Sequence, residues 1–293
     1  MKGKKKEDKV FSILAAVWIV VVSVTIVRLF LGYNNTDIEV NTKEDKQRLK
    51  VVELEKKYNT DENIDKEYLN KIVDLCKDYP DATPILERYK EYPNRLLKLA
   101  ISNKEAIKYV AEYPEKKDTY VQDIDISSEC KQGEVPLFIQ WDSRWGYKEY
   151  AGGLVGYTAC GPTCLSMLYT YFTEDYSYTP GEMAEFSERE GYVEQGMGTK
   201  WLLMTEGANK LGLTSKVIRK KEENVANQIK FGKKIICSVG PGYFTEQGHF
   251  IVITDYNNGS VKINDPNSRK KSSRMWNYAD ISSQIKSMWA IGK

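Results

Sequence analysis

The stretch that decides the fold is residues 248–265, which read GHFIVITDYNNGSVKIND. An apolar, β-branched run predicts a buried strand over Phe250 to Asp255. The NNG triplet that follows predicts a tight hairpin turn, and Val261 to Asn264 form the expected returning strand. Antiparallel pairing of these two strands brings Asp265 close to His249.

His249 is the single histidine of the chain. Any cysteine–histidine or serine–histidine chemistry must therefore use this imidazole. Upstream, residues 158–164 read TACGPTC, and Pro162 suits the first turn of a helix. The unpaired N–H groups and positive dipole end of that turn favour a thiolate at Cys160. Cys164 falls a full turn inside the same helix, where a thiol packs as a small apolar group.

Together these residues form a candidate catalytic set. Cys160 would be the nucleophile, His249 the base, and Asp265 the carboxylate that holds the imidazole in one tautomer. The backbone N–H of Cys160 and the side-chain amide of Gln140 are candidate donors to an oxyanion. One histidine and one Cys-x-x-x-Cys pair do not make a four-ligand zinc site, so no metal is expected. Residues 240–242 lack the strand–helix context of a phosphate-binding loop, so no cofactor is expected.

The remaining pattern places helices before strands, which is the order of an α+β fold. A short strand and turn is expected over Val135 to Asp142. Further helices are expected over Pro162 to Phe172, from Thr179-Pro180 through Phe186, over Thr199 to Leu211, over Glu223 to Phe231 and over Tyr278 to Ile285, and further strands over Lys234 to Val239 and Met288 to Ile291.

The N-terminus predicts a membrane anchor. Five lysines stand in the first nine residues, and an apolar run follows over residues 10–31. Its charge-free part spans about 27 Å as a helix, close to the thickness of a bilayer core. The lysines place the N-terminus in the cytoplasm and the C-terminal part outside the cell. A cleaved signal peptide fits less well, because no small-x-small site follows the run.

The chain therefore divides into a basic tail (1–9), a transmembrane anchor (10–31), an extracytoplasmic helical stalk or spacer with its linker (32–130) and a C-terminal domain (131–293). Within the stalk or spacer (32–130), residues 63–117 form a small all-helical region in which Tyr-Pro recurs three times. This region is open to three interpretations: a spacer, a substrate-docking surface or an inhibitory segment.

Charge and cysteine content exclude other classes of protein. Lys plus Arg number 43 and Asp plus Glu number 41, so no broad basic face is expected and nucleic acid is not an expected partner. Five cysteines are too few for a disulfide-dense scaffold, and an odd number leaves at least one thiol unpaired within the chain. The pairing of the other four, Cys76, Cys130, Cys164 and Cys237, is left open.

Gln140, the CGPT run from Cys160, the GHF run around His249 and Asp265-Pro266 together resemble the double-glycine leader peptidase family. This is the bacteriocin-processing branch of the papain-like cysteine peptidases, and the resemblance is to its stand-alone Gram-positive members. It covers about residues 135–293. It implies a papain-like fold, with the nucleophile helix packed on an antiparallel sheet, and the roles given above for Cys160, His249, Asp265 and Gln140.

The expected function is that of a membrane-anchored extracellular cysteine peptidase, a hydrolase that cleaves an exported peptide or a cell-wall peptide. Two alternatives stay open. The domain could be a catalytically idle binding module, or a transglutaminase-like enzyme that uses the same triad to join a glutamine to an amine.

Overall fold

The computed structural model describes residues 42–119, 121 and 123–293. The expected basic tail (1–9) and membrane anchor (10–31) lie outside the described residues. In the part of the chain that is described, no helix combines the length and apolar character needed to cross a membrane. The chain divides into two units after Lys50, and the second, Val51–Lys293, is compact and contains the candidate site and the contacts argued below.

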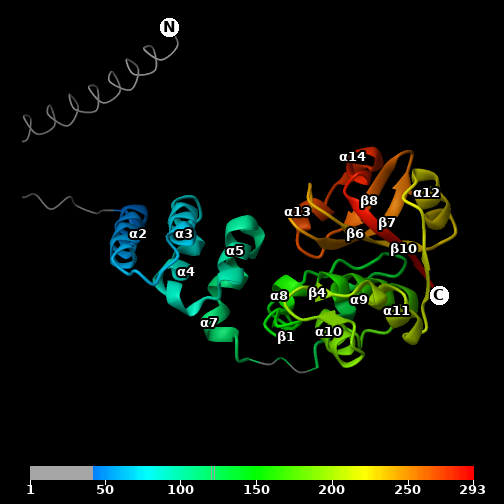
Figure 1. The fold of residues 1–293 in the computed structure, drawn as a ribbon, viewed down its shortest axis with the longest axis horizontal. Coiled ribbons are helices and arrows are strands. Elements are labelled where there is room, and N and C mark those ends of the chain that lie inside the picture. The colour runs from blue at the N-terminus through cyan, green and yellow to red at the C-terminus, as the bar shows by residue number, and fades with distance from the viewer. Residues whose placement is uncertain (1–41, 120, 122) are drawn as a thin grey trace, which may run out of the picture. The chain divides into compact units, whose positions relative to one another are not determined.

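The N-terminal helical region, defined above as residues 63–117, is built from short helices (Figure 1). Asp65 caps the first of them by accepting hydrogen bonds from the backbone N–H groups of Glu67 and Tyr68. Together with the preceding helix, the elements are α2 (Lys43–Asn59), α3 (Lys66–Asp78), η1 (Pro80–Ala82), α4 (Thr83–Glu87), η2 (Tyr89–Glu91), α5 (Asn94–Ser102), η3 (Lys104–Ala106), α6 (Ile107–Ala111) and α7 (Tyr113–Lys116).

The C-terminal domain has a helical half followed by a sheet half. The helical half contains η4 (Ser127–Glu129), β1 (Glu149–Tyr150), β2 (Gly153–Leu154), α8 (Val155–Thr158), α9 (Cys160–Thr173), α10 (Pro180–Arg189), β3 (Val193–Glu194), β4 (Gly198–Thr199), η5 (Trp201–Met204) and α11 (Glu206–Lys210). The sheet half contains β5 (Thr214–Val217), α12 (Glu222–Lys230), β6 (Lys234–Val239), β7 (His249–Asn257), β8 (Ser260–Asn264), α13 (Arg269–Ser272), β9 (Met275–Asn277), α14 (Tyr278–Ser282) and β10 (Ile285–Gly292).

The six-stranded sheet is antiparallel throughout, in the order β5-β10-β6-β7-β8-β9. Strands β7 and β8 form the predicted hairpin, with Val252 opposite Asn264 and Ile253 opposite Ile263. The pairing shifts by one residue between Ile253 and Asp255, which is a β-bulge. The turn contains Asn258 at φ 44° and Gly259 at φ 82°, the left-handed conformations that a tight hairpin turn needs.

Alternation along the strands gives the sheet two apolar faces. Ile236, Phe250 and Val252 pack with the helical half, in the cluster that also holds the buried side chains of α9. Ile235, Ile251 and the other buried side chains on the opposite face of the sheet pack with α12 and α14. Helix α9 is buried along its whole first ten residues after Cys160, so it is the central helix of the domain.

Most predicted helices and strands of the C-terminal domain have counterparts in the structure, but the helix expected over Thr199 to Leu211 is divided into η5 and α11, with Thr199 in β4. Residues 135–139 form no strand, contrary to prediction. Pro136 lacks an N–H, and the carbonyls of Val135 and Pro136 accept hydrogen bonds from the side chain of Asn264 instead of a neighbouring strand. Strands β5 and β9, at the two edges of the sheet, were not predicted, because their short sequences alternate weakly.

Candidate active site

Cys160 begins the buried helix α9, and its side chain is half-buried. The first turn of a helix presents N–H groups that have no acceptor within the helix, together with the positive end of the dipole. Both features stabilise a thiolate over a thiol. The structure places Cys160 at the start of α9, where the sequence predicted it, and its role as nucleophile stays a prediction.

His249 begins β7, and its imidazole lies between the thiol and a carboxylate. Its Nε2 lies 2.7 Å from Oδ1 of Asp265, and its side chain also hydrogen-bonds with that of Cys160. Since Nε2 faces the carboxylate, Nδ1 is left to face the sulfur. The imidazole is buried, with 8% of its residue surface exposed.

Asp265 is fully buried, and several backbone groups hold it in place. Its Oδ1 accepts a second hydrogen bond, of 2.8 Å, from the backbone N–H of Asn267. Its own backbone N–H donates to Oγ of Ser272, and its carbonyl accepts from the backbone N–H of Ser268. The carboxylate therefore presents a fixed oxygen to His249.

The pKa of His249 follows from these contacts. Burial lowers it, since the charged imidazolium loses water, but the charge of Asp265 and the hydrogen bonds to Asp265 and Cys160 outweigh this and raise the pKa from 6.5 to about 10. The raised pKa favours the imidazolium, which is the form that pairs with a thiolate.

Gln140 is near the other three residues, but its side chain is not hydrogen-bonded to any of them in the described part of the chain. Its backbone N–H donates to the carbonyl of Pro266, the residue after Asp265, at 2.8 Å. Its Nε2 donates to the carbonyl of Gly156 at 3.0 Å, and its Oε1 has no partner among the described residues. One N–H of the amide group remains for a substrate oxygen.

Three of the other four cysteines, Cys76, Cys164 and Cys237, are buried, whereas Cys130 is half-buried like Cys160. All five lie in the described part of the chain, and none of them forms a disulfide there. Burial raises the pKa of the Cys164 and Cys237 thiols well above the usual range, and that of Cys76 to about 12. The described residues contain no group of three or more histidine, cysteine, aspartate or glutamate side chains arranged to hold a metal ion.

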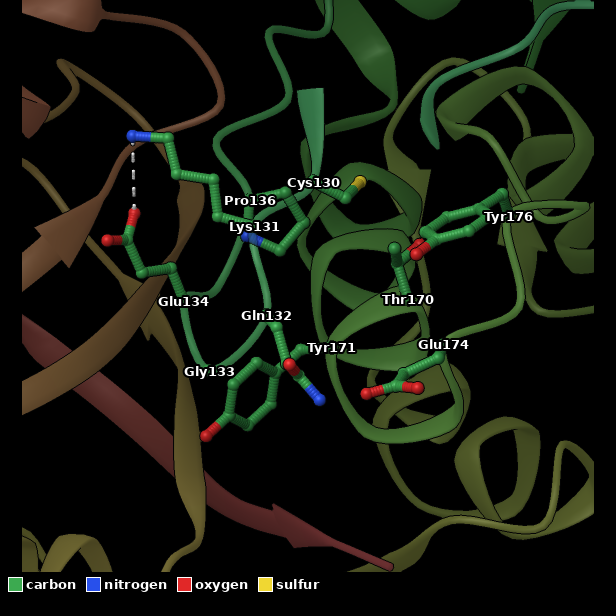
Figure 2. A pocket seen from close by; sticks show the side chains of 10 residues that line it. All are labelled: Cys130, Lys131, Gln132, Gly133, Glu134, Pro136, Thr170, Tyr171, Glu174 and Tyr176. Carbon is green, nitrogen blue, oxygen red and sulfur yellow. Dashed lines mark ion pairs between the residues drawn. The ribbon is translucent and has the colours of Figure 1, made fainter. Parts of the chain in front are cut away.

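A pocket of about 250 Å³ lies away from this cluster. Figure 2 shows it between residues 130–136 and the C-terminal end of α9, with the Lys131–Glu134 ion pair drawn as a dashed line. Its lining includes Thr170, Tyr171 and Glu174, whereas Cys160 is at the other end of the helix. This pocket is therefore not the place where the thiol would meet a substrate.

The packing of Gly161 gives a testable prediction. A Cβ at this position would lie 2.9 Å from each of three side-chain atoms of Thr199 in β4. We expect Gly161→Ala to lower the free energy of unfolding by about 1–3 kcal/mol, because the clash displaces the start of α9 or β4. Urea unfolding measures the change. Gly248→Ala is the control, since a Cβ there meets nothing within 4 Å, and equal stability of the two variants would contradict the prediction.

The sequence did not indicate which residues position the four candidate catalytic residues. Asn267, Ser268 and Ser272 arrange the loop around Asp265 through hydrogen bonds, and no sequence pattern distinguishes them from ordinary turn residues. The Asp-Pro step was the only local signal for this loop. Likewise, nothing in the sequence indicates that Thr199 packs against Gly161.

In the described domain, the buried helix α9 packs on an antiparallel sheet, which is the arrangement of a papain-like cysteine peptidase. The family model named Peptidase_C39 like family matches residues 132–292, and the chain belongs to this family. Its C-terminal part is therefore a domain of the cysteine-peptidase type.

Two solved structures are similar to the chain. One is the peptidase domain of Streptococcus ComA, described as a bi-functional ABC transporter involved in a quorum-sensing pathway, with 22% identity over 54% of this chain and 96% of that one, at a TM-score of 0.38. The other is a putative C39-like peptidase from Bacillus anthracis, with 15% identity over 55% of this chain and 96% of that one, at a TM-score of 0.32. No curated protein matches the sequence.

Proposed function

We propose that this protein is a membrane-anchored, extracytoplasmic cysteine peptidase that hydrolyses a bond in an exported or cell-envelope peptide. The observation that carries the proposal is that the only imidazole of the chain lies in contact with both the Cys160 thiol and the Asp265 carboxylate. Family membership supports the same class of reaction.

In the first half of the reaction, the Cys160 thiolate attacks the carbonyl carbon of the peptide bond. The oxygen of the tetrahedral intermediate becomes negative, and the backbone N–H of Cys160 and the Gln140 amide donate to it. His249 gives its Nδ1 proton to the leaving amine as the C–N bond breaks. The acyl part of the substrate is then held as a thioester.

In the second half, His249 is neutral and accepts a proton from water, which attacks the thioester carbonyl. Collapse of the second tetrahedral intermediate releases the acid and returns the thiolate–imidazolium pair. Asp265 keeps its charge in both halves and holds Nε2, so that the same ring nitrogen faces the sulfur throughout.

The location rests on the N-terminal sequence. The lysines of residues 1–9 and the apolar run of residues 10–31 support a single-pass anchor with the C-terminal domain outside the cell. Carbonate extraction of membranes tests it: full-length protein is expected in the pellet, and its release into the soluble fraction would contradict the anchor.

The peptidase itself is tested by comparing the peptides secreted by cells that carry the wild-type protein or Cys160→Ala. We expect at least one peptide to accumulate in its uncleaved form in the variant. Identical peptides and an unchanged phenotype would instead favour an idle binding module. Incorporation of an added amine into the substrate, in place of hydrolysis, would favour the amide transferase.

A further inference from the structure

The N-terminal helical region contacts the loop that carries Asp265. Nδ2 of Asn103 donates to the backbone carbonyl of Asn267 at 2.6 Å and lies 3.1 Å from its side-chain oxygen. Oδ1 of Asn103 caps η3 by accepting from the backbone N–H of Glu105 at 3.1 Å. Asn103 therefore fixes Glu105 and the Asp265 loop relative to each other.

Glu105 makes the larger set of contacts with this loop. Its half-buried carboxylate accepts hydrogen bonds from the Ser268 hydroxyl, from the backbone N–H of Arg269 at 2.9 Å and from that of Lys270 at 3.3 Å. The two N–H groups begin α13 and have no acceptor within that short helix. Ser268 caps α13 by accepting from the backbone N–H of Lys271, and Glu105, from a distant part of the sequence, adds an anionic cap for the two preceding N–H groups.

The loop transmits this anchoring to the imidazole through few bonds. The backbone N–H of Asn267, one residue before Ser268, donates to Oδ1 of Asp265, and this is the oxygen that faces Nε2 of His249. Any shift of residues 267–270 therefore changes a hydrogen bond of the carboxylate oxygen that orients the imidazole.

The helical region also supports the Gln140 side of the cluster. Ile139, Trp141 and Tyr147 share one apolar core with the helical region. The Tyr109 ring stacks on that of Tyr147 at 4.6 Å, and its hydroxyl donates to the carbonyl of Gly146 at 2.6 Å.

Two further contacts complete this side. A Cβ at Gly156, whose carbonyl accepts from Gln140, would collide with the Tyr109 hydroxyl. Nε1 of Trp141 donates to the same Asn267 carbonyl as Asn103 does. Helices α5 and α8 are in contact.

We propose that Glu105 is a positioning residue for Asp265, and that the helical region is a structural part of the catalytic centre rather than a spacer. This inference rests on the proposed function, since it assigns Asp265 its catalytic role. Glu105 acts only through the loop of residues 267–270 and touches no reacting atom. Loss of its carboxylate lets the loop move, which weakens the hold of Asp265 on the imidazole.

The experiment measures the pKa of His249 by NMR in the full chain, where a single histidine gives one set of imidazole signals. We expect Glu105→Ala to lower this pKa and to lower kcat/KM by about 10–100-fold, with the larger part in kcat, because small misplacements of catalytic groups have costs of this size. Glu105→Gln keeps one oxygen as an acceptor, so we expect a smaller change of the same sign, and it carries the test if the alanine variant does not fold.

Glu91→Ala is the matched control. Glu91 lies in the same helical region and pairs with Arg88, 2.7 Å away, and we expect the His249 titration of this variant to match the wild type. A folded Glu105→Ala variant with wild-type titration and wild-type kcat/KM would overturn the proposal. The titration reads the position of Asp265 even if no peptide is cleaved, so failure of this inference and failure of the peptidase proposal are distinguishable.

Discussion

Replacing Cys160 by alanine is expected to abolish peptide hydrolysis, with a loss of about 10⁶-fold, the size seen when the nucleophile of a peptidase triad is removed. The same change is expected to remove rapid labelling by iodoacetamide at neutral pH. Both effects follow from the position of the sulfur at the start of α9 and beside an imidazole whose raised pKa favours the cation. Peptide mapping by mass spectrometry after timed labelling identifies which thiol reacts.

Cys130→Ala is the matched control for this experiment. Cys130 is also half-buried, but it lines the pocket at the far end of α9, and burial raises its pKa. We expect this variant to keep full activity and full labelling of Cys160. His249→Ala should slow the labelling of Cys160, because the thiolate loses its cation. Equal labelling rates in the wild type and in His249→Ala would remove the main argument for a peptidase.

The second large effect is expected for Asp265→Asn, with a loss of about 10⁴-fold in kcat, because a neutral amide no longer holds the imidazole in the required tautomer. Asp265 raises the pKa of His249 by its charge and by its hydrogen bond, whereas burial alone lowers it. We therefore expect the pKa of His249 to fall from about 10 toward or below the 6.5 of a free histidine. NMR titration of the single histidine measures the shift.

The sign of the pH dependence follows from the direction of this shift. In the wild type the folded pKa is above the unfolded value, so the stability that the charged imidazole contributes is complete below about pH 6.5 and is lost as the pH rises toward about 10. In Asp265→Asn, the free energy of unfolding should no longer fall between about pH 6.5 and about pH 10. Asp255→Asn is the control, since Asp255 lies on the exposed end of the same strand. An unchanged titration in Asp265→Asn would contradict the assigned role of the carboxylate.

The hairpin and helix α9 could be predicted because local sequence determines both. The NNG triplet fixes the turn at residues 257–259. The position of this turn determines which residues of β7 and β8 are opposite each other. Pro162 and the apolar residues after it are sufficient to indicate α9. The contact of His249 with Asp265 followed from these two local facts, and the structure contains it.

The contacts that hold the cluster could not be predicted, because they join residues far apart in the sequence. Glu105 and Ser268 are separated by 163 residues, and neither stands in a pattern that suggests a partner. A short strand and turn was predicted over Val135 to Asp142, but the carbonyls of Val135 and Pro136 accept hydrogen bonds from the Asn264 side chain, and local sequence carries no information about such bonds. The N-terminal anchor stays a prediction of the sequence.

The bulge between Ile253 and Asp255 limits how this hairpin can evolve. Successive side chains of a strand point to opposite faces, so a single inserted or deleted residue between His249 and Asp265 would either turn the carboxylate away from the ring or demand a second irregularity to restore it. Length variation among related chains should therefore be rare within residues 249–265 and common in connections that carry no such constraint. Loops grafted onto this domain should therefore leave the number of residues between His249 and Asp265 unchanged.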